Sequence, residues 1–245
     1  MFSYLFNTTL YNPIYNLLVF LIDVLPGGDV GLAVIILTIV VKLVLFPVSF
    51  GAVKTQMKMK LVEPELKEVQ NKYKDKKEEL AKATFEIYRK NKINPFSSII
   101  ILFIQIPVIF ALYFAIWKGL PVIKTDILYS FVSNPETISM NFLGLIDVSQ
   151  SKVFILALIA GITQFYQAKL AMPNFKKPET KNDSKEISFK DEMMKGMHVQ
   201  VRYVLPVLTF FIAYSLISVI AIYWTISNLF AIGQEYYIRK RVKIS

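Results

Sequence analysis

Residues 30–50 read VGLAVIILTIVVKLVLFPVSF, and this stretch decides the class of fold. Lys42 is its only charged residue. An α-helix rises about 1.5 Å per residue, so about 20 apolar residues cross a hydrocarbon core about 30 Å thick. The stretch therefore predicts a membrane-spanning helix, and we expect an integral membrane protein, not a soluble enzyme.

The composition of the whole chain agrees with this prediction. Of its 245 residues, 54% are hydrophobic and 14% aromatic, which is too apolar for a soluble domain of this size. The formal net charge is nevertheless +10, so charged and apolar runs are segregated. The chain has no cysteine, which excludes disulfides, cysteine-ligated zinc, a cysteine nucleophile and a lipid-modified cysteine. No basic segment precedes the first apolar run, so we expect no cleaved signal peptide.

Four further spans are expected, at residues 96–117, 152–172, 199–216 and 219–237. The last two share an apolar region that is too long for one ordinary span, so a tight turn near Ser215 to Ser218 must divide it. The expected fold class is therefore all-α: a polytopic membrane protein with five transmembrane helices.

The distribution of lysine and arginine predicts the orientation and supports the number of spans. No Lys or Arg precedes Lys42, whereas residues 51–94 hold twelve and residues 173–203 hold seven. The outer loop, residues 118–151, has few basic residues, and the tail at 238–245 is again basic. Basic residues favour the cytoplasmic side. With five spans all dense clusters are cytoplasmic and the N-terminus is outside, whereas four spans would leave the basic tail outside.

Residues 1–29 form the expected outer segment. Pro13 fits the start of a helix, and the apolar stripe that follows it favours a short interfacial helix that Pro26-Gly27-Gly28 ends. A sixth span is the alternative. It is disfavoured because polar residues interrupt residues 2–25: Asn7, Asn12, Asn16 and Asp23.

Residues 51–95 predict a cytoplasmic helical hairpin. Leu66, Val69 and Tyr73 recur at helical spacing before a charged turn at residues 74–77, and Leu80 and Ile87 recur after it. One narrow apolar seam of this kind is typical of a coiled-coil hairpin, with a solvated spacer as the alternative. Residues 173–198 are polar and are expected to form a mobile cytoplasmic loop.

Motifs for catalysis are absent from the sequence. It contains neither a phosphate-binding loop nor a Gly-x-Ser-x-Gly motif. The single histidine, His198, lies at an expected membrane boundary and is interpreted as an interfacial residue, because a lone histidine binds metal poorly. We therefore expect no catalytic residue, no cofactor and no metal.

Lys42 is the most informative polar residue inside a span. It lies eight residues before the expected cytoplasmic end at Phe50, which is about 12 Å deep. Lysine snorkels over only part of this distance, so the charge needs a wet cavity or a partner. No acidic residue lies inside a span except at the margins, which favours a water-filled groove over an ion pair. Thr38 precedes Lys42 by one turn on the same face.

Other polar and aromatic residues accompany Lys42 inside the spans. Gln105, Gln164, Asn228 and Gln234 together indicate a polar interior, although each by itself fits a hydrogen bond to a neighbouring helix. Tyr223 and Trp224 lie mid-span, where aromatic residues serve packing more often than function.

Four motifs carry a family resemblance. They are Thr38-x-x-x-Lys42-x-x-x-x-Pro47; Asn94-Pro95 before Gln105-Ile106-Pro107 and Ala111-Leu112-Tyr113; Tyr223-Trp224-x-x-x-Asn228-Leu229-Phe230 before Gln234; and the hairpin motifs Pro64-Glu65-Leu66, Tyr73-Lys74 and Tyr88-Arg89-Lys90. With these motifs in one order from about Tyr11 to Arg241, the chain resembles the YidC family of membrane protein insertases. It departs from the family pattern in two places. Lys42 stands where the family usually has Arg, and Phe96-Ser97-Ser98-Ile99 replaces a step with Gly, Cys and Pro.

The resemblance implies an insertase that moves substrate helices from the cytoplasm into the bilayer through a hydrophilic groove, without nucleotide. The groove residues would be Lys42, Thr38, Gln105, Gln164, Tyr223, Trp224 and Asn228. Substrate or ribosome contacts would come from Tyr88, Arg89, Lys90, Arg239, Lys240 and Arg241. The implied partners are nascent membrane proteins, the lipid bilayer, the ribosome and the Sec translocon, without specific nucleic-acid binding. The implied place is the bacterial cell membrane, and the protein resembles the smaller type of Gram-positive or minimal bacteria.

A small transporter or channel is the alternative function, since it would also need buried polar groups. An odd number of spans and the lack of an internal repeat argue against it. A membrane-embedded enzyme acting on lipids is a third class, and the missing catalytic motifs argue against that.

Overall fold

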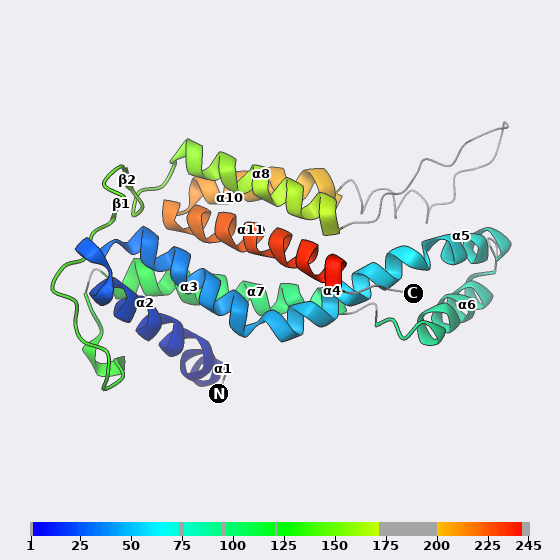
Figure 1. Ribbon diagram of the computed structural model, residues 1–245, viewed down its shortest axis with the longest axis horizontal. Coiled ribbons are helices and arrows are strands. Elements are labelled where there is room, and N and C mark those ends of the chain that lie inside the picture. Colours follow the sequence, from blue (N-terminus) through cyan, green and yellow to red (C-terminus); the bar gives the residue numbers. More distant parts are fainter. Residues whose placement is uncertain (1, 74–75, 95–96, 121, 172–199, 242–245) are drawn as a thin grey trace. The chain divides into compact units, whose positions relative to one another are not determined.

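The computed structural model describes residues 2–73, 76–94, 97–120, 122–171 and 200–241, and it is mostly helical (Figure 1). The expected loop at 173–198, with His198, lies outside these residues. The chain forms two compact units. The first comprises Met1–Val44 and Gln105–Ile232, and the second comprises Leu45–Ile104 and Gly233–Ser245.

The helices and strands divide between the two units. The first unit holds α1 (Phe2–Phe6), η1 (Asn7–Tyr11), α2 (Asn12–Val24), η2 (Pro26–Gly28), α3 (Val30–Val44), the later part of α7 (Ser97–Phe114), η3 (Ala115–Gly119), η4 (Thr125–Ile127), β1 (Asn141–Phe142), β2 (Ile146–Asp147), α8 (Phe154–Ala171), η5 (Gln200–Val204), α10 (Leu205–Ser215) and the first part of α11 (Ser218–Arg241). The second unit holds α4 (Phe46–Leu61), α5 (Glu63–Lys72), α6 (Lys77–Lys90) and the remaining parts of α7 and α11.

Several helices have the length and composition of membrane spans. Among the described residues, Ser3–Val24 and Phe154–Ala171 are long and apolar enough, and the broken pair Val30–Val44 with Phe46–Leu61 makes a third if it counts as one span. Gln105–Gly119 and Arg202–Ser215 are shorter apolar helices. The structure thus supports an all-α membrane protein with two or three such spans, and five spans stay a prediction. α11 has 24 residues, but its polar residues lower its hydropathy.

The first expected span differs from the sequence prediction at its cytoplasmic end. Helix α3 ends at Val44, and α4 begins at Phe46 with Pro47 in its first turn. Proline has no backbone N–H and its ring disturbs the preceding turn, so the break at this point has a local cause. The helical backbone then continues to Leu61 instead of ending at Phe50. The end of the apolar run at Phe50 therefore does not coincide with the end of the helix at Leu61.

The N-terminal segment packs into the core of the first unit. Tyr15, Leu18 and Val19 of α2 are completely buried and belong to the same apolar cluster as α3. The Tyr15 hydroxyl donates to the Gly119 carbonyl (3.0 Å) and accepts from the Lys124 N–H (2.8 Å). Ser3–Val24 is long enough to cross a membrane, so its length fits the alternative of a sixth span as well as an interfacial helix.

A short β-hairpin and two isolated β-bridges accompany the helices among the described residues. β1 and β2 pair antiparallel, with Asn141 opposite Asp147. The Asp29 carboxylate holds this loop and α3 together, because it accepts from Leu32 N–H (3.0 Å) and from Leu143 N–H (2.7 Å). Gly28 has a φ of +63°, and a Cβ there would lie 2.2 Å from the Thr137 carbonyl oxygen. Only glycine therefore fits this turn.

Helices α8 and α10 form a closely packed pair through small residues. Ala157, Ala160 and Ala213 are buried between neighbouring helices, and a Cβ on Gly161 would lie 3.2 Å from Phe210 Cβ. Small residues allow close helix contacts where lipid, not water, surrounds the helices. The chain then turns between Ser215 and Ser218, as the sequence predicts.

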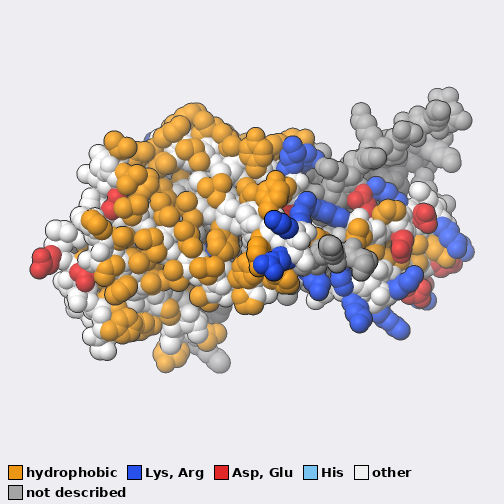
Figure 2. Space-filling view, viewed as in Figure 1, with side chains coloured by type: hydrophobic (Ala, Val, Ile, Leu, Met, Phe, Trp, Pro, Cys, Tyr) orange, Lys and Arg blue, Asp and Glu red, His pale blue; other side chains and the backbone are white. Residues whose placement is uncertain are grey.

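The second unit has a small apolar core of its own. Val62, Ile87 and Ile93 are buried, and Leu66 and Val69 pack against them. Figure 1 shows α5 and α6 side by side. On the face drawn in Figure 2, apolar side chains cover most of the first unit, whereas charged side chains gather on the second. The charged side chains on this face of the second unit suit contact with water.

Candidate functional site

Three of the expected groove residues form one polar chain inside the first unit. The Lys42 ammonium donates to Gln105 Oε1 at 3.0 Å, and Gln105 Nε2 donates to the Tyr223 hydroxyl. Ser227, one turn after Tyr223, hydrogen-bonds to the same hydroxyl. Helices α3 and α7 thus each contribute one member, and α11 contributes two, to a network built among apolar side chains.

The network gives Lys42 one hydrogen bond, and this bond is to an uncharged group. Among the described residues, Lys42 forms no ion pair with a carboxylate, and its hydrogen-bond partner is the uncharged Gln105 amide. Lys42 and Gln105 are half-buried, whereas Tyr223 is 1% exposed. The phenol therefore fixes the amide from the buried side, and the amide oxygen faces the cation.

The remaining expected groove residues make separate contacts. Thr38 is fully buried and donates to the Val34 carbonyl of its own helix (2.6 Å). Gln164 donates to Gln167 at 3.3 Å, and Asn228 donates to Thr163 at 3.4 Å. The first two contacts are local to one helix. Only the Asn228 contact joins two helices, α11 and α8, in the manner of the packing alternative.

Trp224 is half-buried and packs against the apolar clusters of the first unit. The structure thus brings together Lys42, Gln105 and Tyr223, and it gives Trp224 packing contacts.

The two groups of expected substrate or ribosome contacts lie at helix ends in the second unit. Arg89 and Lys90 are exposed in the last turn of α6, and burial raises the pKa of the neighbouring Tyr88. Arg239, Lys240 and Arg241 occupy the last turn of α11. The structure therefore places these three basic residues in a helix, where the sequence analysis expected a tail.

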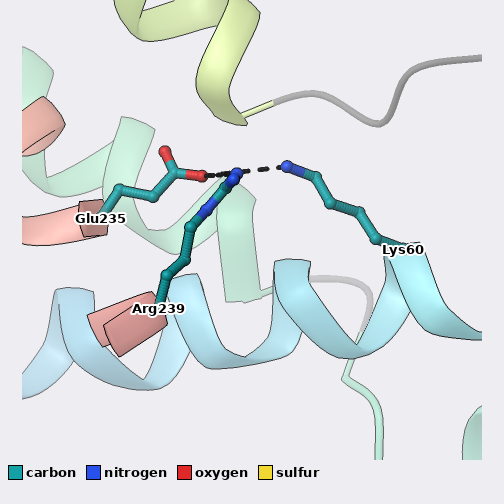
Figure 3. A network of polar contacts seen from close by, with 3 residues as sticks. All are labelled: Lys60, Glu235 and Arg239. Atoms are coloured by element: carbon teal, nitrogen blue, oxygen red, sulfur yellow. Dashed lines mark hydrogen bonds and ion pairs between the residues drawn. The ribbon is translucent and has the colours of Figure 1, made fainter. Parts of the chain in front are cut away.

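Sequence analysis missed a buried charge cluster in the second unit. Glu235 of α11 is 5% exposed, and its carboxylate accepts from Arg239 at 2.5 Å and lies 3.8 Å from the Lys60 ammonium (Figure 3). The spacing of Glu235 and Arg239, four residues apart in a helix, was a visible signal for the first pair. Gln234 also donates to the Ser49 hydroxyl at 2.6 Å.

An open apolar groove of about 590 Å³ lies between α8 and α10. Its lining includes Leu158, Phe165, Tyr166, Val207 and Phe211. This lining suits hydrocarbon, not water, so the groove differs in kind from the polar groove expected at Lys42. No group of three potential metal ligands occurs among the described residues.

Comparison with known proteins adds independent information. Residues 20–245 match the family model described as 60Kd inner membrane protein. The chain is 31% identical over 217 residues to the membrane protein insertase YidC of Pelobacter propionicus, which aligns with 88% of the chain and 36% of that protein. It is 27% identical to the protein of the same name from Fusobacterium nucleatum, over 95% of the chain and 98% of the relative. It is 28% identical to membrane protein insertase YidC 2 of Listeria innocua, over 89% of the chain and 66% of the relative. The chain therefore spans about a third of the first relative and nearly all of the second.

Proposed function

Since the chain belongs to the YidC family, described as 60Kd inner membrane protein, we propose that it is a membrane protein insertase. It moves the transmembrane segments of nascent membrane proteins from the cytoplasm into the bilayer. Its family is one of bacterial inner membrane proteins, and its helices are apolar. Within that membrane it has five spans, an outer N-terminus and a cytoplasmic C-terminus.

The observation that carries the mechanism is the chain from Lys42 through Gln105 to Tyr223. A polar substrate tail loses its hydration when it enters hydrocarbon, and each unpaired polar group there is costly. A half-buried ammonium beside an amide can donate and accept hydrogen bonds with such a tail and can hold water next to it, part-way across the membrane. The proposed groove is open to the cytoplasm and to lipid, and it needs no nucleotide because the apolar segment of the substrate gains free energy on entering lipid.

The positive charge of Lys42 in this network would attract an acidic substrate tail. The Gln105 amide partner leaves the positive charge of Lys42 available to an acidic tail. Thr38, Gln164, Trp224 and Asn228 shape the walls of the groove from α3, α8 and α11. Tyr88, Arg89 and Lys90, together with the last turn of α11, receive substrates, the ribosome or the Sec translocon on the cytoplasmic side.

Reconstitution tests this function against its alternatives. Purified protein in liposomes is given a single-span membrane protein, a labelled solute and a radiolabelled phospholipid in separate assays. We expect protected insertion of the single-span protein above that of empty liposomes, without solute flux or lipid conversion. Solute flux without insertion would favour a channel, and conversion of the phospholipid would favour an enzyme.

A further inference from the structure

The apolar groove between α8 and α10 is separate from the polar network at Lys42 and is not explained by it. Figure 1 shows the two helices side by side, and both belong to the first unit. The groove measures about 590 Å³, within the range of roughly 300–1,000 Å³ that is usual for ligand sites. Its lining consists of aliphatic and aromatic residues and one glycine, so it favours hydrocarbon over water.

Fixed packing contacts between the two helices form the groove. A Cβ on Gly161 would lie 3.2 Å from Phe210 Cβ and 3.3 Å from the Pro206 carbonyl oxygen, so the helices meet closely there. The Phe154 ring packs edge-on against Phe210 with 5.6 Å between centroids, and Phe210 stacks on Tyr214 at 6.0 Å. The groove is therefore part of the packed helix pair and is formed before any ligand binds.

A cation lies at the end of the groove where α10 begins. Helix η5 runs directly into α10, so Arg202 lies about one turn before Pro206, which lines the groove. The Arg202 guanidinium is 5.9 Å from the centre of the Tyr203 ring, and that ring is 6.0 Å from the ring of Phe165, another lining residue. Both observations place Arg202 beside the groove.

Arg202 has a hydrogen-bond donor that the described residues leave without an acceptor. Its Nε is buried and has no hydrogen-bond partner among them, and the side chain forms no ion pair with any of them. A buried donor without an acceptor is costly and rare, so it points to an acceptor of another kind. Guanidinium groups bind phosphate through paired N–H groups, of which Nε–H is one.

We propose that Arg202 binds the phosphate of an anionic phospholipid while the groove between α8 and α10 holds one of its acyl chains. A cation at one end of a hydrocarbon-lined groove fits an amphipathic ligand with an anionic head. RNA has phosphate without hydrocarbon, and a helix of another protein has hydrocarbon without phosphate. Tyr203, which is 52% exposed, is of a type enriched at the level of lipid head groups. With the proposed topology this end faces the cytoplasmic leaflet, which carries anionic lipids.

Lipid retention by the full-length protein tests the head-group contact, and it is measured without any substrate of insertion. The protein is purified in detergent, mixed with equal amounts of phosphatidylglycerol and phosphatidylcholine, and analysed by native mass spectrometry. We expect preferential retention of phosphatidylglycerol. Arg202→Gln should weaken this retention by about fivefold, the effect of one basic residue near an anionic surface. Lys82→Gln, which removes an exposed charge from α6, should leave it unchanged.

A bulky side chain tests the groove separately from the charge. Val207→Trp places a large ring at a lining position and should reduce the retention of phosphatidylglycerol. Leu208→Trp is the matched control, because Leu208 is the next residue of α10 and is exposed like Val207 but does not line the groove. Dihexanoyl phosphatidylglycerol, which has the same head group on short chains, should compete only weakly with the long-chain lipid.

Several outcomes would overturn the proposal. Equal retention of the two lipids, or unchanged retention by Arg202→Gln, would remove the anionic head-group site. Equal retention by Val207→Trp and Leu208→Trp would show that the acyl chain lies elsewhere, and displacement by millimolar inorganic phosphate would show a simple anion site. A dimer without bound lipid that Val207→Trp dissociates would assign the groove to a second copy of the chain.

Thermal melting curves identify the variants that are folded. Arg202→Lys is the second variant at this position, since it keeps the charge but lacks the Nε–H group and the planar fork. We expect it to retain less phosphatidylglycerol than the parent protein. An Arg202→Lys protein that retains as much would contradict the guanidinium contact.

Discussion

Replacing Lys42 with alanine is expected to slow the insertion of acidic-tailed substrates by about tenfold and of neutral-tailed substrates much less. A substrate carboxylate about 4 Å from the ammonium gains ~1 kcal/mol in bulk water and ~4 kcal/mol near a protein surface with an effective dielectric constant of about 20. Lys42 is half-buried and is hydrated in the proposed groove, so we take a value near the lower end. A loss of about 1.4 kcal/mol in the barrier is a tenfold change in rate.

The assay measures initial insertion rates in proteoliposomes for two single-span substrates that differ only in acidic or amide side chains of the outer tail. Lys42→Arg retains charge and reach, so its rates should stay close to those of the parent protein. Lys169→Ala is the matched control, because Lys169 is an exposed lysine in the last turn of α8. Added salt should reduce only part of the difference, since screening is weaker away from bulk solvent.

Equal insertion of both substrates by Lys42→Ala and by the parent protein would refute the reasoning, and Lys42 would then be a structural residue. Family membership would be unaffected. Folding needs a separate check, because the substitution removes the partner of the Gln105 oxygen. Gln105 is half-buried, so water can replace the ammonium, and we expect the thermal midpoint to change little.

Three further predictions address other parts of the protein. Cysteines introduced at Asn7 and Asn134 should be labelled from outside and one at Asn182 only from inside, and outside labelling at Asn182 would contradict five spans. Glu235→Gln should destabilise the protein by about 2 kcal/mol in thermal unfolding, because it removes the buried negative charge that contacts both Lys60 and Arg239; an unchanged melting curve would contradict this. Since the pKa of Lys60 lies below 10.5 in the folded state, the unfolded chain binds more protons just below that pH, so stability should rise with pH through this window and the rise should shrink in Lys60→Gln.

Most of the helical framework could be predicted from the sequence, because long apolar runs have few other structures open to them in a membrane. Helix α8, Phe154–Ala171, lies within the expected segment 152–172, whereas α10 begins at Leu205, after the expected start at residue 199. Helix ends at the cytoplasmic side could not be predicted in the same way. Lysine and arginine end an apolar run, but both are good helix formers. Helix α4 therefore continues through Lys58 and Lys60 to Leu61, and α11 continues to Arg241.

Individual members of the candidate site could also be predicted, but not their pairing. Lys42 and Gln105 are 63 residues apart, and Gln105 and Tyr223 are 118 apart, so their contacts depend on which helix faces meet. Glu235 with Arg239 has a local signal in its four-residue spacing, whereas Lys60 has none because it comes from another helix.

The uncharged partner of Lys42 has a consequence for the proposed groove. An acidic partner would hold the ammonium firmly, but it would also cancel the field that draws in an acidic tail, and the tail would have to compete with a resident carboxylate. A glutamine carbonyl satisfies one N–H of the ammonium and leaves the whole charge in place. The amide nitrogen is in turn held by the buried Tyr223 hydroxyl, so its oxygen stays directed at Lys42. Tyr223→Phe should therefore weaken discrimination between acidic and neutral tails without removing the charge, and a Tyr223→Phe protein that discriminates as well as the parent would show that the amide needs no such support.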